Sequence, residues 1–120
     1  MSRFALLLYP NFSLQEVTCL TSALAVWFGE EIDYIASENK EYCSEEGLRV
    51  VPTKTMADIN ITDYDCVILP GTINPLPALY DERLIDFLKS GINTDVVFAA
   101  ISSSPLLLAK AGVLNGKKFT

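Results

Sequence analysis

The sequence contains no histidine and only three cysteines among its 120 residues. Without histidine it lacks the usual base of a Ser-His-Asp hydrolase, so a catalytic triad of that kind is disfavoured. Cys19, Cys43 and Cys66 are too scattered for a zinc pattern, and their odd number fits a reduced cytoplasm better than a disulfide scaffold. We therefore expect a cytoplasmic protein with no metal and no cofactor, and we expect Cys19 and Cys66 to be buried.

Positive charge is also scarce, since nine Lys and Arg residues face fifteen Asp and Glu residues and leave a net charge of -6. Such an acidic surface repels phosphate backbones and anionic lipid, so neither nucleic acid nor a membrane surface is an expected partner of this chain alone. No apolar run approaches the roughly 18 residues that a membrane-spanning helix needs. The opening run Phe4–Tyr9 is too short for a secretory signal and is followed directly by Pro10, so we interpret it as a strand.

The sequence does have alternating strand and helix patterns, and half of its residues are hydrophobic, which is ample for one packed domain over residues 1–120. Apolar runs of strand length lie at 4–9, 32–36, 65–70 and 95–100. Helical spacing follows at 14–28, 82–90 and 105–111, and the polar segment 38–51 is expected to be a solvated, hairpin-like excursion at the sheet edge. This order predicts a doubly wound α/β fold, with a mostly parallel sheet sandwiched by helices.

The ends of the predicted helices carry recognisable signals. Ser13 is expected to cap the first helix, whose apolar positions run from Leu14 to Phe28, and Gly29 is expected to end it. Asp81 is expected to cap the second helix and Gly112 to end the third. In a parallel sheet the loops that follow the strands meet at one edge, so we expect Glu16, Thr72 and Ser102 to lie close together.

Three segments together resemble the ThiJ/PfpI family, the superfamily of the parkinsonism-associated deglycase. "DYDCVILPG" is similar to its aspartate-strand-Pro-Gly signature, "AAISSSPLLLAKAGVLNGKKFT" to its strand-to-helix elbow and following helix, and "YPNFSLQEV" to its first loop. The resemblance spans nearly all 120 residues. It implies a flavodoxin-like fold of the kind found in class I glutamine amidotransferases.

In that family a cysteine stands on a strained strand-to-helix turn, and the acidic residue of the first loop hydrogen-bonds its sulfur. The resemblance places Ser102 and Glu16 at these two positions, as nucleophile-position serine and acid/base. It also implies that the backbone N–H groups of Thr72 and Ser103, presented by the turn at Gly71, act as oxyanion-type donors. We expect Ser102 to have a sparsely populated backbone conformation.

The sequence departs from the family pattern where the chemistry would occur. Ser102 replaces the cysteine, Ser104 replaces a glycine, and Thr72 stands where the family prefers a second glycine. A serine hydroxyl needs an adjacent general base, and the carboxylate of Glu16 is a weak base for an alcohol. The resemblance therefore supports the prediction of a binding pocket more strongly than it supports the prediction of the family's activity.

Simpler explanations exist for the same residues. Ser102 to Ser104 can act as the N-cap of the helix that Pro105 opens, and Glu16 can stabilise the start of the first helix through its charge. The family continues beyond the equivalent of Thr120 with a further strand and a histidine-bearing loop, so we expect residues 1–120 to be incomplete at the C-terminus. Its exposed strand edge, and the homodimers common in the family, predict a homodimer.

Three functional hypotheses remain. The first is a homologue without cysteine chemistry that binds a small carbonyl or amide-like metabolite, or that serves as a stress-related structural homologue. The second is an active hydrolase, hydratase or lyase that uses Ser102 or an activated water with Glu16. The third is the ligand-sensing domain of a transcriptional regulator.

Overall fold

A computed structural model describes residues 2–116 of the chain and contains a five-stranded parallel sheet in the order β5-β2-β1-β6-β7. The strands are β1 (Arg3–Leu7), β2 (Glu31–Ala36), β5 (Lys54–Thr55), β6 (Cys66–Leu69) and β7 (Val97–Ala100). Phe4 pairs with Cys66, and Cys66 pairs with Val97, so β1, β6 and β7 are adjacent and parallel as predicted. The segment that follows β2 forms a separate hairpin of β3 (Tyr42–Cys43) and β4 (Arg49–Val50).

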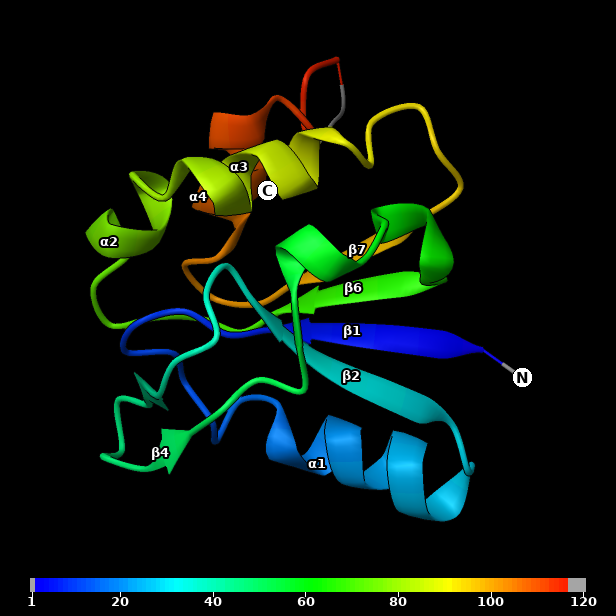
Figure 1. Ribbon diagram of the computed structural model, residues 1–120, viewed down its shortest axis with the longest axis vertical. Coiled ribbons are helices and arrows are strands. Elements are labelled where there is room, and N and C mark those ends of the chain that lie inside the picture. The colour runs from blue at the N-terminus through cyan, green and yellow to red at the C-terminus, as the bar shows by residue number, and fades with distance from the viewer. Residues whose placement is uncertain (1, 117–120) are drawn as a thin grey trace.

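Helices cover both faces of this sheet (Figure 1). On one face lies α1 (Thr18–Ser22), which continues into the π-helix η1 (Ala23–Trp27). On the other face lie α2 (Leu76–Leu79), α3 (Glu82–Lys89) and α4 (Pro105–Ala111), together with the 3₁₀ turns η2 (Met56–Asp58) and η3 (Ile61–Asp63). The doubly wound α/β fold is therefore confirmed. No helix within residues 2–116 is both long and apolar enough to cross a membrane.

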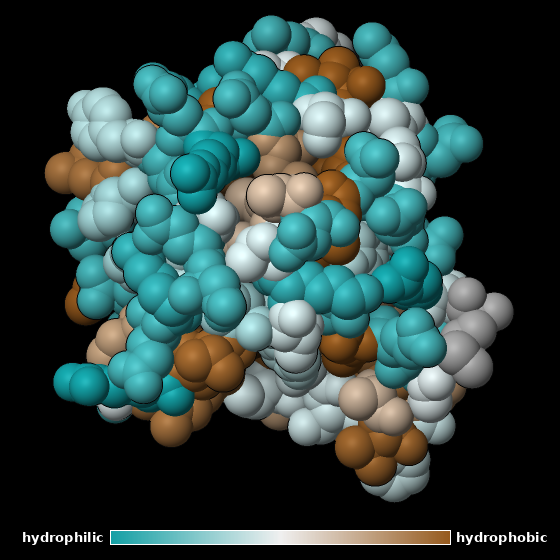
Figure 2. Space-filling model, viewed as in Figure 1, coloured by the Kyte–Doolittle hydropathy of each residue, from teal (hydrophilic) through white to brown (hydrophobic). Residues whose placement is uncertain are grey.

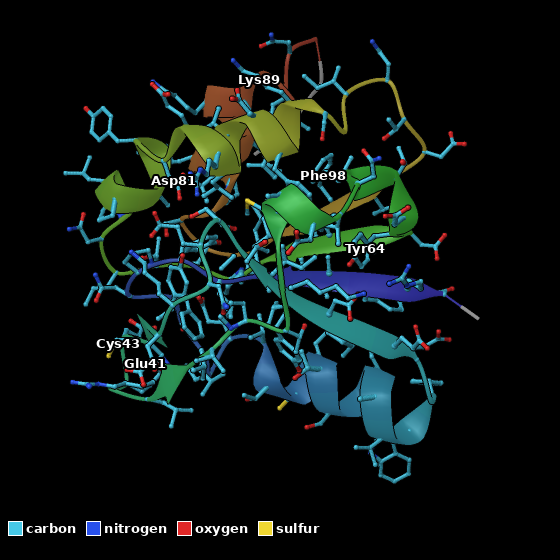
Figure 3. The ribbon with its side chains drawn as sticks, in the orientation of Figure 1. Glu41, Cys43, Tyr64, Asp81, Lys89 and Phe98 are labelled. Atoms are coloured by element: carbon cyan, nitrogen blue, oxygen red, sulfur yellow. The ribbon has the colours of Figure 1, made fainter. Side chains whose placement is uncertain are left out.

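The larger hydrophobic core lies between the sheet and the helices α3 and α4. Leu69 of β6, Leu88 of α3 and Leu107 of α4 are fully buried in it. Each such side chain stabilises the fold by about 1.5–3 kcal/mol relative to an exposed position. At the start of α3 the Asp81 carboxylate (Figure 3) accepts the N–H groups of Arg83 and Leu84, which confirms the predicted cap.

A second, polar cluster joins four segments on the sheet. The carboxylate of Asp33 on β2 accepts hydrogen bonds from Tyr64 at 2.7 Å and Arg3 at 3.0 Å, and it pairs with Lys54 at 3.1 Å. Tyr64 is labelled in Figure 3. Burial alone would raise the pKa of Asp33, but the hydrogen bonds from Tyr64 and Lys54 and the charges of Lys54 and Arg3 lower it overall. The ionised carboxylate therefore helps to hold β1, β2, β5 and the segment before β6 together.

The first helix differs from its prediction. It begins at Thr18 after Val17, with no side-chain cap, and the buried hydroxyl of Ser13 has no hydrogen-bond partner. Trp27 is 82% exposed and Phe28 is 72% exposed, although both belong to the apolar positions of the predicted helix. The exposure is not confined to this end, since neither α1 nor η1 contains a buried residue and Leu20, before the π-helix, is also exposed. A hydrophobic patch at the lower right of Figure 2 marks the end of this helix.

Two further expectations need correction. Cys19 is exposed and Cys66 is half-buried, so neither cysteine lies fully in the core. Cys19 lies on a helix that buries little besides the preceding Val17, and Cys66 lies at the amino end of β6, before its fully buried residues. Gly29 and Gly112 end their helices with φ values of 65° and 83°, in the left-handed region that favours glycine, as predicted.

Candidate functional site

Three loops that follow β1, β6 and β7 meet at the carboxyl edge of the sheet. Backbone hydrogen bonds tie the first two together, since Ser13 N–H donates to the Gly71 carbonyl at 2.7 Å and Ile73 N–H donates to the Asn11 carbonyl at 3.3 Å. The hydroxyl of the buried Thr72 also donates to the Pro10 carbonyl at 3.0 Å. The first and second loops therefore form one framework beside the third.

Glu16 and Ser102 converge over Gly71. A Cβ atom placed on Gly71 would overlap the Glu16 carboxylate oxygen Oε1 and would lie 2.8 Å from the Ser102 Cβ. Both Glu16 and Ser102 are exposed, so a solute can reach both side chains. Among the residues that the structure describes, no direct hydrogen bond links the two side chains. The site therefore contains a solvent-exposed carboxylate and a solvent-exposed hydroxyl, and Gly71, which has no side chain, leaves space between them.

Ser102 has φ 59°, which is the sparsely populated backbone conformation expected at this turn. A non-glycine residue pays a conformational cost of about 1–3 kcal/mol in such a region. The conformation is maintained by its neighbours, because Ile101 N–H donates to the Leu69 carbonyl at 3.1 Å and Ser104 N–H donates to the Ile101 carbonyl at 3.1 Å. The turn therefore presents the Ser102 side chain outward at the end of β7.

The three consecutive serines have three different environments. Ser104 is fully buried, and its hydroxyl lies 2.9 Å from the Leu69 carbonyl and 2.7 Å from the Ile101 N–H, which joins the ends of β6 and β7. Ser103 crosses to the second loop, where its hydroxyl contacts the main chain of Thr72. The N-cap position of α4 is Ser104, whose side chain makes no capping hydrogen bond. The helix-cap explanation is therefore right about the position of Ser104 before Pro105, but the hydroxyls of the triplet do not cap the helix.

The resemblance implies two backbone N–H donors, those of Thr72 and Ser103, and they differ in whether they already donate a hydrogen bond within the protein. Thr72 N–H donates to the Ser103 hydroxyl at 3.1 Å and is therefore engaged within the protein. Ser103 N–H donates to no protein group within residues 2–116. The reason the sequence missed this difference is that the Ser103 contact joins two loops 31 residues apart, which no local pattern records.

Two residues outside the predicted set, Glu46 and Tyr9, lie in the surroundings of Glu16. Glu46, in the turn between β3 and β4, accepts the N–H groups of Gln15 at 2.9 Å and Leu14 at 3.2 Å, and the Gln15 bond lowers its pKa. The segment around Glu46 is therefore more than the solvated surface expected from its charge. The buried Tyr9 donates its hydroxyl to the Pro70 carbonyl, and its pKa is raised by burial and then by the charge of Glu16.

Known proteins with similar sequences and folds bear on this site. A family profile described as the DJ-1/PfpI family matches residues 2–120. The chain is 44% identical over 109 residues to DJ-1 protein homolog E of Arabidopsis thaliana, covering 91% of this chain and 25% of that protein. It is 28% identical over 114 residues to an isonitrile hydratase of Pseudomonas putida, covering 95% of this chain and 49% of that protein.

Solved structures agree with these matches. A DJ-1 superfamily protein from Agrobacterium tumefaciens superposes with a TM-score of 0.84 at 26% identity, covering 97% of this chain and 61% of that one. DJ-1beta of Drosophila melanogaster shares the fold, with a TM-score of 0.73 at 22% identity and coverage of 93% of this chain and 61% of that one. The present chain thus spans between a quarter and about three fifths of these relatives.

Proposed function

The chain belongs to the DJ-1/PfpI family, and from that premise we propose that it forms a binding site for a small carbonyl or amide-like molecule, without cysteine chemistry. Ser102 takes the position of the family's reactive cysteine in this proposal. Glu16 supplies a hydrogen-bond acceptor, and the Ser103 N–H supplies a donor.

The observation that carries the proposal is the meeting of Glu16 and Ser102 over Gly71. The missing Cβ of Gly71 leaves room in which the two side chains approach each other, and both remain exposed to solvent. A carboxylate accepts hydrogen bonds, a hydroxyl both donates and accepts, and a free N–H donates. These groups complement a ligand that carries a polar N–H or O–H group next to a carbonyl oxygen.

The same groups are poorly suited to nucleophilic catalysis by Ser102. A serine hydroxyl becomes a nucleophile when a general base removes its proton, and the sequence contains no histidine to do so. Glu16 is the nearest candidate base, and within residues 2–116 it makes no hydrogen bond to the Ser102 hydroxyl. The proposal therefore assigns Ser102 to ligand contact rather than to covalent chemistry.

A second candidate function is hydration or hydrolysis with a water molecule that Glu16 activates. The relationship to an isonitrile hydratase favours it, since that protein is related over 95% of this chain. In a hydration Glu16 would accept a proton from water, the water oxygen would bond to the electrophilic carbon of the substrate, and the proton would return to the substrate. In a hydrolysis the bond between that carbon and its leaving group would also break, and the leaving group would take the proton.

Binding experiments test whether the protein has a ligand site at these residues, and they also distinguish the two proposed functions. We would titrate the protein with acetamide, acetaldehyde and methyl isocyanide, and follow the backbone amide resonances by nuclear magnetic resonance. The proposal predicts shifts near Glu16, Gly71 and Ser102 that Glu16→Gln weakens, whereas Glu82→Gln, a matched control on the exposed start of α3, leaves them unchanged. Equal binding in both variants would contradict it, and turnover of the isocyanide that Glu16→Gln abolishes would establish the second candidate.

A further inference from the structure

The N–H group of Thr72 is occupied by a side chain of the same protein. It donates to the Ser103 hydroxyl oxygen at 3.1 Å, and that hydroxyl donates to the Thr72 carbonyl oxygen at 2.9 Å. A single hydroxyl therefore satisfies both polar groups of the Thr72 main chain. Because an N–H group carries one proton, it cannot serve Ser103 and a ligand oxygen at full strength.

The second loop has other anchors besides these two hydrogen bonds. Gly71 and Ile73, on either side of Thr72, are hydrogen-bonded through their main chains to Ser13 and Asn11 of the first loop. The Thr72 side chain is anchored separately, by its hydrogen bond to the Pro10 carbonyl. Removal of the Ser103 hydroxyl should therefore leave the loop where it is and release the polar groups of the Thr72 main chain.

We propose that the Ser103 hydroxyl is an internal occupant of the binding site, which takes the place of a ligand oxygen on the Thr72 N–H and must be displaced when a ligand binds there. This inference rests on the function proposed above, because it concerns the same site. Ser103 is half-buried and directly follows the exposed Ser102, and both of its hydrogen bonds to Thr72 are only partly buried.

The contact also defines which ligands displace the hydroxyl most readily. A replacement group must accept from the Thr72 N–H and donate to the Thr72 carbonyl, as the hydroxyl does. A primary amide or a hydroxyl group does both, whereas an aldehyde or an isonitrile has no N–H or O–H to donate and leaves a buried carbonyl without a partner. Such an orphaned group weakens binding by roughly 5- to 150-fold. The site therefore selects amide- and hydroxyl-bearing ligands.

The test compares native protein with Ser103→Ala, which removes the hydroxyl, and with Ser103→Thr, a matched variant that keeps it. Acetamide and acetaldehyde are titrated in turn while the Thr72 amide resonance is followed by nuclear magnetic resonance. We expect acetamide to bind Ser103→Ala about fivefold more tightly than the native protein, which is the factor that one net hydrogen bond provides. Ser103→Thr should match the native protein, and acetaldehyde should bind more weakly than acetamide at Thr72.

Equal acetamide affinity in native protein and Ser103→Ala would overturn the inference, and so would a Thr72 resonance that responds in neither. Should Ser103→Ala fail to fold, Ser103→Cys replaces the hydroxyl by a thiol that accepts hydrogen bonds weakly, and it must then bind acetamide more tightly than the native protein. Adding Glu16→Gln to Ser103→Ala keeps the two proposals apart. If acetamide binding at Thr72 is then unchanged, the site proposed around Glu16 fails while the role of Ser103 stands.

Discussion

Gly71→Ala should disrupt the meeting of Glu16 and Ser102, because the new Cβ would occupy the space between them. It would overlap the Glu16 carboxylate oxygen and lie 2.8 Å from the Ser102 Cβ, well inside the ordinary contact distance of 3.4 Å. The exposed Glu16 side chain can swing away at small cost. The Ser102 Cβ cannot, because the strained turn at φ 59° fixes its position. We therefore expect Gly71→Ala to lower the free energy of unfolding by about 1–3 kcal/mol, as overpacking of a filled site does.

Urea unfolding measures this loss, and a double-mutant cycle with Ser102→Gly assigns it. Removing the Ser102 Cβ takes away the steric conflict that cannot relax, so the double variant should be less destabilised than the sum of the single variants. Gly29→Ala is the control, because its Cβ would meet nothing within 4 Å and its cost comes from the positive φ alone. Additive effects of Gly71→Ala and Ser102→Gly, or a Gly71→Ala protein as stable as the native one, would refute this geometry.

Three further predictions follow from other contacts. Asp33→Asn should lower the free energy of unfolding by about 1–2 kcal/mol at neutral pH. Because folding lowers the pKa of Asp33, this difference is fully present above the unfolded pKa of about 3.9 and is lost as the pH falls through the folded pKa. Urea unfolding at several pH values can check this. Ser104→Ala should cost about 0.5–1.5 kcal/mol in the same assay, since it removes the hydrogen bonds of a buried hydroxyl while the Ile101 N–H and the Leu69 carbonyl keep the bond between them, and an unchanged midpoint would contradict this. Light scattering should give about twice the chain mass of 13.2 kDa, reduced by Trp27→Asp on the exposed patch of the first helix; a native monomer at all concentrations would exclude the homodimer.

Much of the fold could be predicted because its signals are local. Continuous apolar runs such as Phe4–Tyr9 identified the strands, and Gly112 marked the end of α4 through a left-handed φ that glycine adopts at no steric cost. The adjacency of β1, β6 and β7 followed from the rules of parallel sheets. The exposure of Trp27 did not follow, because hydrophobic spacing identifies the apolar face of a helix but not whether another part of the protein covers that face.

In the candidate site, too, features with a local sequence signal could be predicted and features that depend on long-range contacts could not. The strained backbone of Ser102 was expected from the resemblance of its strand-to-helix turn, and Glu16 was expected from the first loop. The partners of Ser103 and Glu46 were not, since their hydrogen bonds join segments about 30 residues apart. Such contacts depend on how the loops pack at the sheet edge, and a charged or hydroxyl side chain at the surface gives no indication of its partner.

The most direct test of the central claim, that the site binds ligands but has lost cysteine chemistry, compares native protein, Ser102→Ala and Ser102→Cys. Each is assayed for turnover of an aldehyde, an isocyanide and an amide, and for ultraviolet thiolate absorbance and peroxide oxidation. We predict that native protein and Ser102→Ala are equally inert, whereas Ser102→Cys gains a thiolate that oxidises readily beside the free Ser103 N–H. Turnover by the native protein that Ser102→Ala abolishes would contradict the claim and would establish Ser102 as a working nucleophile.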